Sequence, residues 1–315
     1  MDYKALVGSH LKLRHLVLVL AIAENGSLVR AAEELYLTQP ALSRALREAE
    51  SAVGASLFDR TRHGMVPTAA GAACLEHARA VVGQVETLRR RIGELSDPHT
   101  GSVGIGVHVT GANLLVPRAV ARLVEERPLI EVRIREAPPA TLIHELDGGD
   151  LDLLVGRVTD HPSTARLRLV PLYRESYRIV AAAGHPALQL QDAQLADLAA
   201  YPWAIPVAGT PLRDALDKAF ASAGLDSPAR QVECGTPAPT RTLVVEAGFL
   251  AVLPESMAAA DPALRMHPLR LGGMAQDVGY MVTPDRPLTA TAQLLTEHLR
   301  AEAALIDSGL AGEDA

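Results

Sequence analysis

Cysteine is scarce in this 315-residue chain, and its two cysteines, Cys74 and Cys234, lie half the chain apart. Neither belongs to a Cys-x-x-Cys pair or stands beside a histidine cluster, which are the spacings that zinc sites and disulfide frameworks require. We therefore expect two partly buried thiols, with no metal ion and no cofactor.

Long apolar runs are also missing. The longest stretch, LVLVLAIA at 16–23, is far shorter than the ~20 residues needed to cross a bilayer. The N-terminus before it is weakly charged and no small-residue cleavage site follows it, so a secretory signal is not expected. These absences predict a protein without membrane contact that stays in the cytoplasm.

Signatures of catalysis are absent as well. GIGVHVTG lacks the third glycine of a dinucleotide fingerprint, and no GxSxG, HExxH or P-loop sequence occurs. The 11 histidines, His108 and His144 among them, are scattered without metal-ligand spacing. Because no spaced catalytic constellation exists, an enzyme is the disfavoured alternative.

Charge is divided unevenly along the chain, whose net charge is −7. Residues 1–95 hold 12 Lys and Arg against 10 Asp and Glu, a balance of +2; residues 96–315 hold the remaining 18 against 27, a balance of −9. The basic excess at the N-terminal end hints at a polyanionic partner there. The length suits two or three domains of ordinary size.

Three short helices are predicted near the N-terminus. Apolar residues at helical spacing over 11–23 end at an Asn-Gly pair, after which Ser27 can cap a second helix. Thr38 is a good N-cap for a third helix, and Pro40 falls in its first turn, where a missing N–H costs nothing. The apolar face of the third helix comprises Leu42, Leu46, Ala49 and Val53. Two short helices joined by a tight turn form a helix-turn-helix, whose second helix enters the major groove.

The outward face of the third helix carries side chains suited to reading DNA. Glutamine pairs with adenine, arginine pairs with guanine, and a proline edge can contact a thymine methyl group. The predicted DNA-binding residues here are Ser27, Thr38, Gln39, Pro40, Ser43, Arg44 and Arg47, with Thr38 on the sugar-phosphate backbone. For Arg47, a surface salt bridge to Glu48 or Glu50 is an equally weighted alternative.

A β-hairpin and a long helix follow. The stretch 54–71, GASLFDRTRHGMVPTAAG, predicts a short wing with Arg60 and Arg62 near its tip, where they can reach phosphates or a minor groove. From 68 to 95, apolar residues recur at spacings of 4, 3, 4, 3, 4 and 3, at Cys74, Ala78, Val81, Val85, Leu88, Ile92 and Leu95. Three such heptads predict a helix that pairs with a second copy of the chain. The alternative is an amphipathic helix packed on its own domain.

Strands and helices alternate beyond a Pro/Gly/Ser break, SDPHTGS at 96–102, which is the predicted linker. The predicted strands are VGIGVHV, IEVRIREA, LDLLVG, YRIVAA, PWAIPV, RQVECG and FLAVLP. This alternation predicts α/β units with a mostly parallel sheet, over a length comfortable for two small domains.

Taken together, these residues resemble a known family. The run SLVRAAEELYLTQPALSRALREAESAVGASLFDR, followed by PTAAG, is similar in order and spacing to the N-terminal signature of LysR-type transcriptional regulators. GDLDLLVGR, EAGFLAVLP and PLTATAQLLTEHLR resemble segments of the family's effector domain. Leu16 and Leu28 stand where the family usually has Phe, and Ala49 where it has Leu, so we expect somewhat different core packing.

The resemblance implies three parts: a winged helix-turn-helix at 1–67, a dimerising linker helix at 68–95, and an effector domain like a periplasmic binding protein at 96–315. It divides the effector domain into two α/β subdomains, subdomain I at 102–170 and 267–310 and subdomain II at 171–266. It also implies a homotetramer on double-stranded DNA, whose bending responds to a small-molecule effector in the cleft between the subdomains. A stand-alone solute-binding protein is the other alternative, against which residues 1–95 argue.

The effector is expected after the carboxyl ends of strands, where free helix amides favour anions. By resemblance, the candidate residues are Thr110, Asn113, Pro139, Ala140, Arg157, Val207, Gly209, Thr210, Gly235, Thr236 and Phe249. Arg157 can clamp a carboxylate bidentately, or it can form a hinge salt bridge instead. YPWAIPVAGTPLR is similar to a branch that includes regulators of aromatic-acid and sugar-related genes. An aromatic or organic acid is therefore the first expectation, and a sugar the second.

Overall fold

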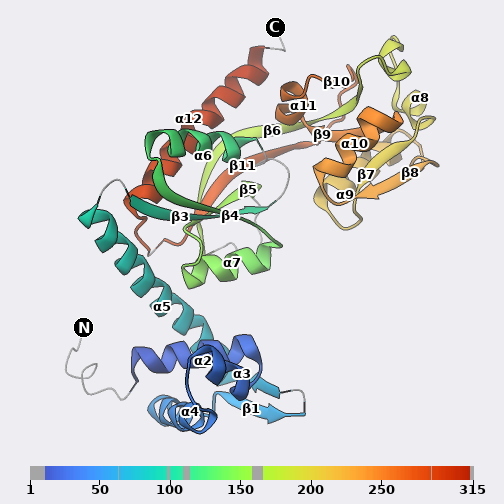
Figure 1. The fold of residues 1–315 in the computed structure, drawn as a ribbon. Coiled ribbons are helices and arrows are strands. Elements are labelled where there is room, and N and C mark those ends of the chain that lie inside the picture. The colour runs from blue at the N-terminus through green and yellow to red at the C-terminus, as the bar shows by residue number, and fades with distance from the viewer. Residues whose placement is uncertain are drawn as a thin grey trace.

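The computed structural model describes residues 11–62, 64–97, 100–108, 114–157, 166–284 and 286–312. A small helical unit stands at the N-terminal end, one long helix leads away from it, and an α/β part follows (Figure 1). No helix among the described residues combines the length and apolar character needed to cross a bilayer.

The N-terminal unit contains the three predicted helices and the wing. Its elements are α2 (Leu13–Asn25), α3 (Leu28–Glu34), α4 (Gln39–Val53), β1 (Phe58–Thr61) and β2 (Gly64–Pro67). Gly26 ends α2 in the left-handed conformation, at φ 59°, and its amide donates to the carbonyl of Ile22. The three helices share one core, whose most buried members include Ile22, Ala31, Leu42, Ala49 and Leu57. Val53, predicted to face this core, is exposed because it is the last residue of α4.

Two glycines allow the wing and the long helix to sit close to the rest of the unit. Gly64, at φ 116°, lies so near the carbonyl of Gly26 that a side chain would meet that oxygen at 2.3 Å. A β-carbon placed on Gly71 would lie 2.0 Å from the carbonyl oxygen of Leu57. Neither position has room for a β-carbon, which explains why glycine occupies both.

The long helix α5 (Ala69–Ser96) begins at Thr68. The Thr68 hydroxyl donates to the carbonyl of Ser56 at 2.7 Å and accepts from the amide of Gly71 at 3.0 Å, so it both caps α5 and holds the start of the helix against the wing. Of the predicted heptad stripe, Ala78 is buried in this chain, whereas its later members Val81, Leu88, Ile92 and Leu95 are exposed. Among the described residues, no other segment buries these later members of the stripe.

One sheet runs through the α/β part, and within the described residues it has nine strands. Their bounds are β3 (Thr100–His108), β4 (Leu129–Glu136), β5 (Leu153–Arg157), β6 (Arg168–Ala182), β7 (Trp203–Pro206), β8 (Gln231–Cys234), β9 (Leu250–Pro254), β10 (Leu264–Met266) and β11 (Ala275–Val282). The order is β4-β3-β5-β11-β6-β9-β7-β8, with β10 also paired to β6. β3 is parallel to β4 and β5, and β7 is parallel to β8 and β9. Because β11 runs antiparallel to β5 and β6, the sheet is mixed rather than mostly parallel.

Strand β6 joins two halves of this sheet. Residues up to Ser176 pair with β11, whereas residues from Tyr177 onward pair with β9. The first half carries α6 (Leu115–Glu126), α7 (Pro139–Gly148) and α12 (Ala290–Gly312). The second carries the short turn η2 (Pro186–Gln189), α8 (Leu195–Ala199), α9 (Pro211–Ser222), α10 (Pro237–Ala247) and α11 (Glu255–Ala260).

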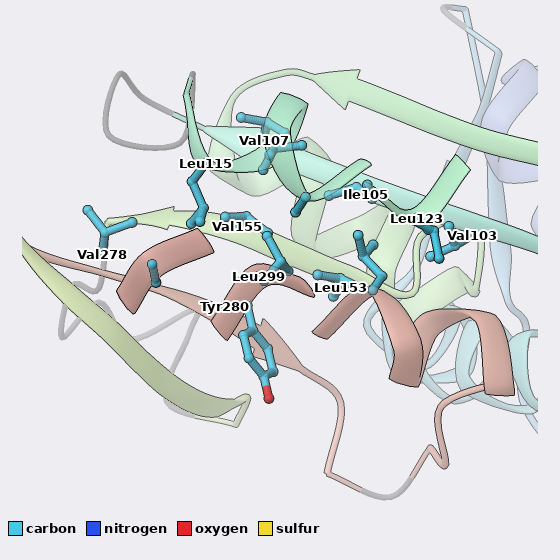
Figure 2. Packing of buried hydrophobic residues seen from close by; sticks show 14 of the residues in the cluster. Val103, Ile105, Val107, Leu115, Leu123, Leu153, Val155, Val278, Tyr280 and Leu299 are labelled. Atoms are coloured by element: carbon cyan, nitrogen blue, oxygen red, sulfur yellow. The ribbon is translucent and has the colours of Figure 1, made fainter. Parts of the chain in front are cut away.

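Each half has its own core. In the first half, Leu153 and Val155 point to the face covered by α6 and α12, whereas Leu154 points to the face covered by α7. Figure 2 shows Val103, Ile105, Leu115, Leu123 and Leu299 converging between strands and helices. In the second half, Trp203 and Phe220 meet edge to face at a ring-centroid distance of 5.5 Å. Two separate cores joined by a shared strand are the arrangement in which the halves can hinge.

Helix α5 is fastened to the first half of the sheet. Arg90 donates to the Asp152 carboxylate at 2.7 Å, and the same carboxylate oxygen accepts from the amide of Gly104 at 2.8 Å. Farther along α5, Glu94 accepts from the amide of Ala290 at 2.8 Å. The predicted linker is also shorter than expected, because residues 100–102 already belong to β3. Helix α5 and the sheet are thus bonded directly.

Candidate DNA interface and effector cleft

The recognition helix α4 begins as its sequence predicts. The Thr38 hydroxyl accepts from the amide of Ala41 at 3.4 Å, and Pro40 lies in the first turn. Leu42, Leu46 and Ala49 are buried, which turns Gln39, Arg44 and Arg47 to the surface. The first turns of α4 therefore present polar side chains away from the core.

Hydrogen bonds order part of this surface. The Gln39 side-chain amide donates to the Ser43 hydroxyl at 3.1 Å, one helical turn later. The alternative ion pairs for Arg47 do not form: Glu48 pairs with Arg14 at 3.4 Å, and Glu50 accepts from the amide of Leu57 at 2.9 Å. Within the described ranges, Arg47 has no hydrogen-bond or ion-pair partner.

The wing and the turn before α4 extend the same basic surface. Arg60 and Arg62 are exposed on the β1–β2 hairpin, and Met65 ties the hairpin to Gly26 through a 2.9 Å backbone bond. Ser27 occupies the N-cap position of α3, but its hydroxyl makes no capping bond. Tyr36, which the sequence reasoning passed over as part of a tight turn, is 97% exposed at φ 54°. A positive φ is uncommon for a residue other than glycine, and at Tyr36 it accompanies an aromatic ring that lies fully in solvent.

The candidate effector residues gather in part around one hollow of 380 Å³ between the two halves of the sheet. Its lining includes six of the predicted residues, Arg157, Val207, Gly209, Thr210, Gly235 and Thr236. Pro139 and Ala140 are exposed at the start of α7 and do not line it, and Phe249 packs instead against the cluster that contains Val180 and Val244. Thr110 and Asn113 lie outside the described residues.

Arg157 supplies the charge of this hollow. It is the last residue of β5, it is half-buried, and its Nε has no hydrogen-bond partner. The predicted hinge salt bridge is not found among the described residues. Burial lowers the pKa of Arg157, and Tyr177 opposes that shift. A guanidinium remains protonated under such a shift, so an unpaired positive charge faces the hollow.

Two helices begin at the same hollow. Thr210 caps α9, its hydroxyl accepting from the amide of Arg213 at 3.3 Å, and Pro211 is the first helical residue. Thr236 stands at the N-cap of α10, but its hydroxyl makes no capping bond and so remains available to a ligand. The partial positive charge at helix N-termini adds to that of Arg157. The arrangement favours a small anion.

Several lining residues were not predicted. Gln276 comes from β11, a strand that the sequence pattern does not predict, and Glu136, the one acid in the lining, ends β4. Cys234 ends β8 and also faces the hollow. A larger, more open hollow of 890 Å³ lies along α9. It shares Arg157, Pro211 and Gln276 with the smaller hollow, but Gly235 and Thr236 do not line it. The smaller hollow therefore gathers more of the predicted effector residues.

Metal-ligating side chains do not cluster in the part of the chain that the structure describes, where no group of three or more His, Cys, Asp or Glu comes together.

Two family models match this chain. One, described as the bacterial regulatory helix-turn-helix protein of the lysR family, covers residues 13–72, and the other, described as the LysR substrate binding domain, covers residues 96–304. The chain is 28% identical over 297 residues to the HTH-type transcriptional regulator GbpR of Azospirillum brasilense, covering 93% of this chain and 87% of GbpR. It is 31% identical over 271 residues to the HTH-type transcriptional regulator GalR of Pseudomonas putida, covering 85% and 68%. Among solved structures, that of CbnR, a LysR family transcriptional regulator, matches in fold with a TM-score of 0.61 at 21% identity, over 93% of this chain and 99% of that one.

Proposed function

Because the chain belongs to the LysR family of bacterial regulators, we propose that α4 and the wing bind operator DNA, and that an organic or aromatic acid in the 380 Å³ hollow changes how that DNA is bound and bent. The chain is a DNA-binding transcriptional regulator and not an enzyme. The finer assignments below concern which residues bind and what they bind.

On the DNA side, the proposal assigns groove contacts to the exposed face of α4 and phosphate contacts to its cap and to the wing. Groove contacts come from Gln39, Pro40, Ser43, Arg44 and Arg47, and backbone contacts from Ser27, Thr38, Arg60 and Arg62. All of these side chains except the half-buried Ser27 and Ser43 are exposed, and Arg47 has no ion-pair partner among the described residues, which supports the proposal. Such a protein works where the DNA is, in the cytoplasm.

The acid is proposed because of one observation above all: Arg157 lines the hollow half-buried, its Nε has no hydrogen-bond partner, and no carboxylate among the described residues pairs with it. A bound carboxylate supplies that partner through charge-assisted hydrogen bonds. The Thr236 hydroxyl and the start of α9 face the same space. The volume fits a small metabolite, since ligand hollows begin at about 300 Å³.

Self-association is proposed through the exposed half of the stripe on α5, residues 81–95, as a homodimer that assembles into a tetramer. The domain limits follow the same scheme: DNA-binding unit 1–67, linker helix 68–95 and effector domain 96–315. Within the effector domain, the change of partner along β6 supports a hinge between the two subdomains near Ser176.

Calorimetric titration of the full-length protein with aromatic acids, aliphatic acids and neutral sugars tests the acid. We expect Arg157→Gln to weaken acid binding by about 10- to 100-fold, which corresponds to one charged hydrogen-bonding pair. Arg118→Gln removes the same charge from an exposed site on α6 and is expected to bind as the wild type does. Acid should also protect Cys234 from maleimide. Tight binding of a neutral sugar, unchanged in Arg157→Gln, would instead support the sugar alternative.

A further inference from the structure

His15, near the start of α2, holds a polar atom in the protein interior without a partner. Its side chain is 2% exposed, and its Nε2 makes no hydrogen bond. A carboxylate oxygen of Glu48 lies 3.7 Å from Nε2, beyond hydrogen-bond distance but within ion-pair distance if the ring is protonated. A buried donor left unpaired costs about 1–3 kcal/mol, so such atoms usually meet a ligand or water.

The proton on the ring can be located. The backbone amide of Lys12 donates to Nδ1 of His15 at 3.3 Å, so Nδ1 carries a lone pair. A neutral imidazole has one N–H, which must then be on Nε2. Burial lowers the pKa of His15, with Arg14 adding to the effect and Glu48 opposing it. The ring is therefore a neutral donor at pH 7.

His15 lines a hollow of 520 Å³ between α2 and α4, which we call the His15 hollow. Its walls carry three cations, Lys12 from the start of α2 and Arg44 and Arg47 from α4. Among the described residues, Glu48 is the one acid in the lining, where it pairs with Arg14 at 3.4 Å and lies 3.7 Å from Nε2 of His15. An unpaired donor surrounded by three positive side chains selects an oxyanion.

We infer that the His15 hollow binds a phosphate group of the DNA backbone, with Nε2–H of His15 donating to a phosphate oxygen between Lys12, Arg44 and Arg47. This inference rests on the proposed binding of α4 to DNA, and it gives Arg44 and Arg47 a phosphate contact in place of the groove contact assigned to them above. The hollow flanks the second half of α4, whereas Gln39 and Ser43 occupy the first half. Phosphates border the groove that a recognition helix enters, and such contacts fix its register. His15 thus positions α4 without reading sequence.

Salt dependence separates this neutral donor from the cations around it. Each cationic contact to a phosphate releases counterions, and loss of one lowers the slope of log Kd against log salt by about 1. His15 carries no charge, so its removal should weaken binding at every salt concentration and leave the slope unchanged. Glu48 repels a phosphate in the hollow, so Glu48→Gln should tighten binding.

The test uses the full-length protein and a fluorescent duplex that the protein itself selects from random sequence, titrated by anisotropy over a range of salt. We expect His15→Leu to lose about tenfold in affinity with the wild-type slope, and Arg47→Gln to lose affinity with a shallower slope. His77→Leu, at an exposed position on α5, is the matched control and should bind as the wild type does. For the carboxylate, Glu125→Gln on the exposed face of α6 controls for the change in net charge.

A chemical change at a single phosphate of the DNA tests the contact with His15 directly. A neutral methylphosphonate at the phosphate that faces the hollow should weaken wild-type binding and have no further effect on His15→Leu. Because His15 is buried, the fold of each variant is checked by circular dichroism. If His15→Leu does not fold, His15→Gln, which keeps a donor, and Glu48→Gln on the surface carry the test.

The possible results separate the inference from the function beneath it. Wild-type affinity in a folded His15→Leu, or an equal methylphosphonate effect in both proteins, would overturn the inference. So would an Nε2 signal of His15 that responds to inorganic phosphate but not to the duplex, because the hollow would then be an anion site unrelated to DNA. Failure of the wild type to bind any duplex would remove the proposed function itself, whereas wild-type salt slopes in both Arg44→Gln and Arg47→Gln, with specific binding retained, would remove only the inference.

Discussion

Removal of the Asp152 carboxylate should loosen the linker helix from the effector domain. Asp152 is buried, with a side chain 2% exposed, and one of its oxygens accepts from both Arg90 on α5 and the amide of Gly104 on β3. Asp152→Ala leaves the Arg90 charge and the Gly104 amide without partners. Breaking a buried pair from one side costs about 3–5 kcal/mol. For a unit of about 200 residues, this lowers the unfolding temperature by roughly 6–20 °C.

A double-mutant cycle with Arg90→Met measures the pair itself in the full-length protein, by urea unfolding followed with far-ultraviolet circular dichroism. The expected coupling free energy is about 1.5–3 kcal/mol, the range for a charged hydrogen bond. Asp150→Ala, two residues earlier and exposed, serves as the control and should stay within about 0.5 kcal/mol of the wild type. A loss below about 1 kcal/mol in Asp152→Ala, or no coupling with Arg90, would refute this account of the attachment.

Three further predictions concern recognition, pH and assembly. Ser43→Ala combined with Arg44→Ala should abolish specific operator binding and leave the oligomer intact; an unchanged mobility shift would contradict the assignment of α4. Burial lowers the pKa of His267 from its ordinary 6.5, so the unfolded chain takes up this proton more readily than the folded one. The contribution of neutral His267 to the free energy of unfolding is present above about pH 6.5 and is lost as the pH falls through the pKa of the folded state. Urea unfolding followed by tryptophan fluorescence should therefore show a midpoint that falls on acidification. A midpoint that does not change with pH would contradict this prediction. Leu88→Lys should dissociate the oligomer in light scattering because Leu88 is exposed on α5, whereas Leu305→Lys on α12 should not; a Leu88→Lys protein of wild-type mass would rule out the α5 contact.

The N-terminal unit could be predicted closely because its signals are local. The cap at Thr38, the early Pro40 and the glycine after Asn25 act within a few residues of themselves, and each lies at a helix end in the structure. Val53 was misplaced because a helical period does not show where a helix leaves the core. His15 shows the limit most clearly: it stands between Arg14 and Leu16 in the sequence, and no local pattern there predicts that its ring is buried beside α4.

The α/β part was less predictable because its pairing is distant. The first part of β6 pairs with β11, a hundred residues later along the chain, and no local pattern records that partnership. Gln276 was missed for the same reason, since it reaches the hollow from β11. Arg157, Thr210 and Thr236, expected where strands end and helices begin, line the same hollow. Phe249 is the first residue of the predicted strand FLAVLP, and its large apolar ring packs in a hydrophobic cluster instead.

The coupling between the cleft and the DNA is tested most directly by operator footprinting of the full-length protein, with and without the tightest-binding acid from the titration panel. The wild-type footprint or its affinity should change when the acid is added. Arg157→Gln should bind the same operator in the absence of acid and show no change on addition. An equal response to the acid in both proteins would contradict the assignment of Arg157, and the absence of a response in the wild type would contradict the acid as effector.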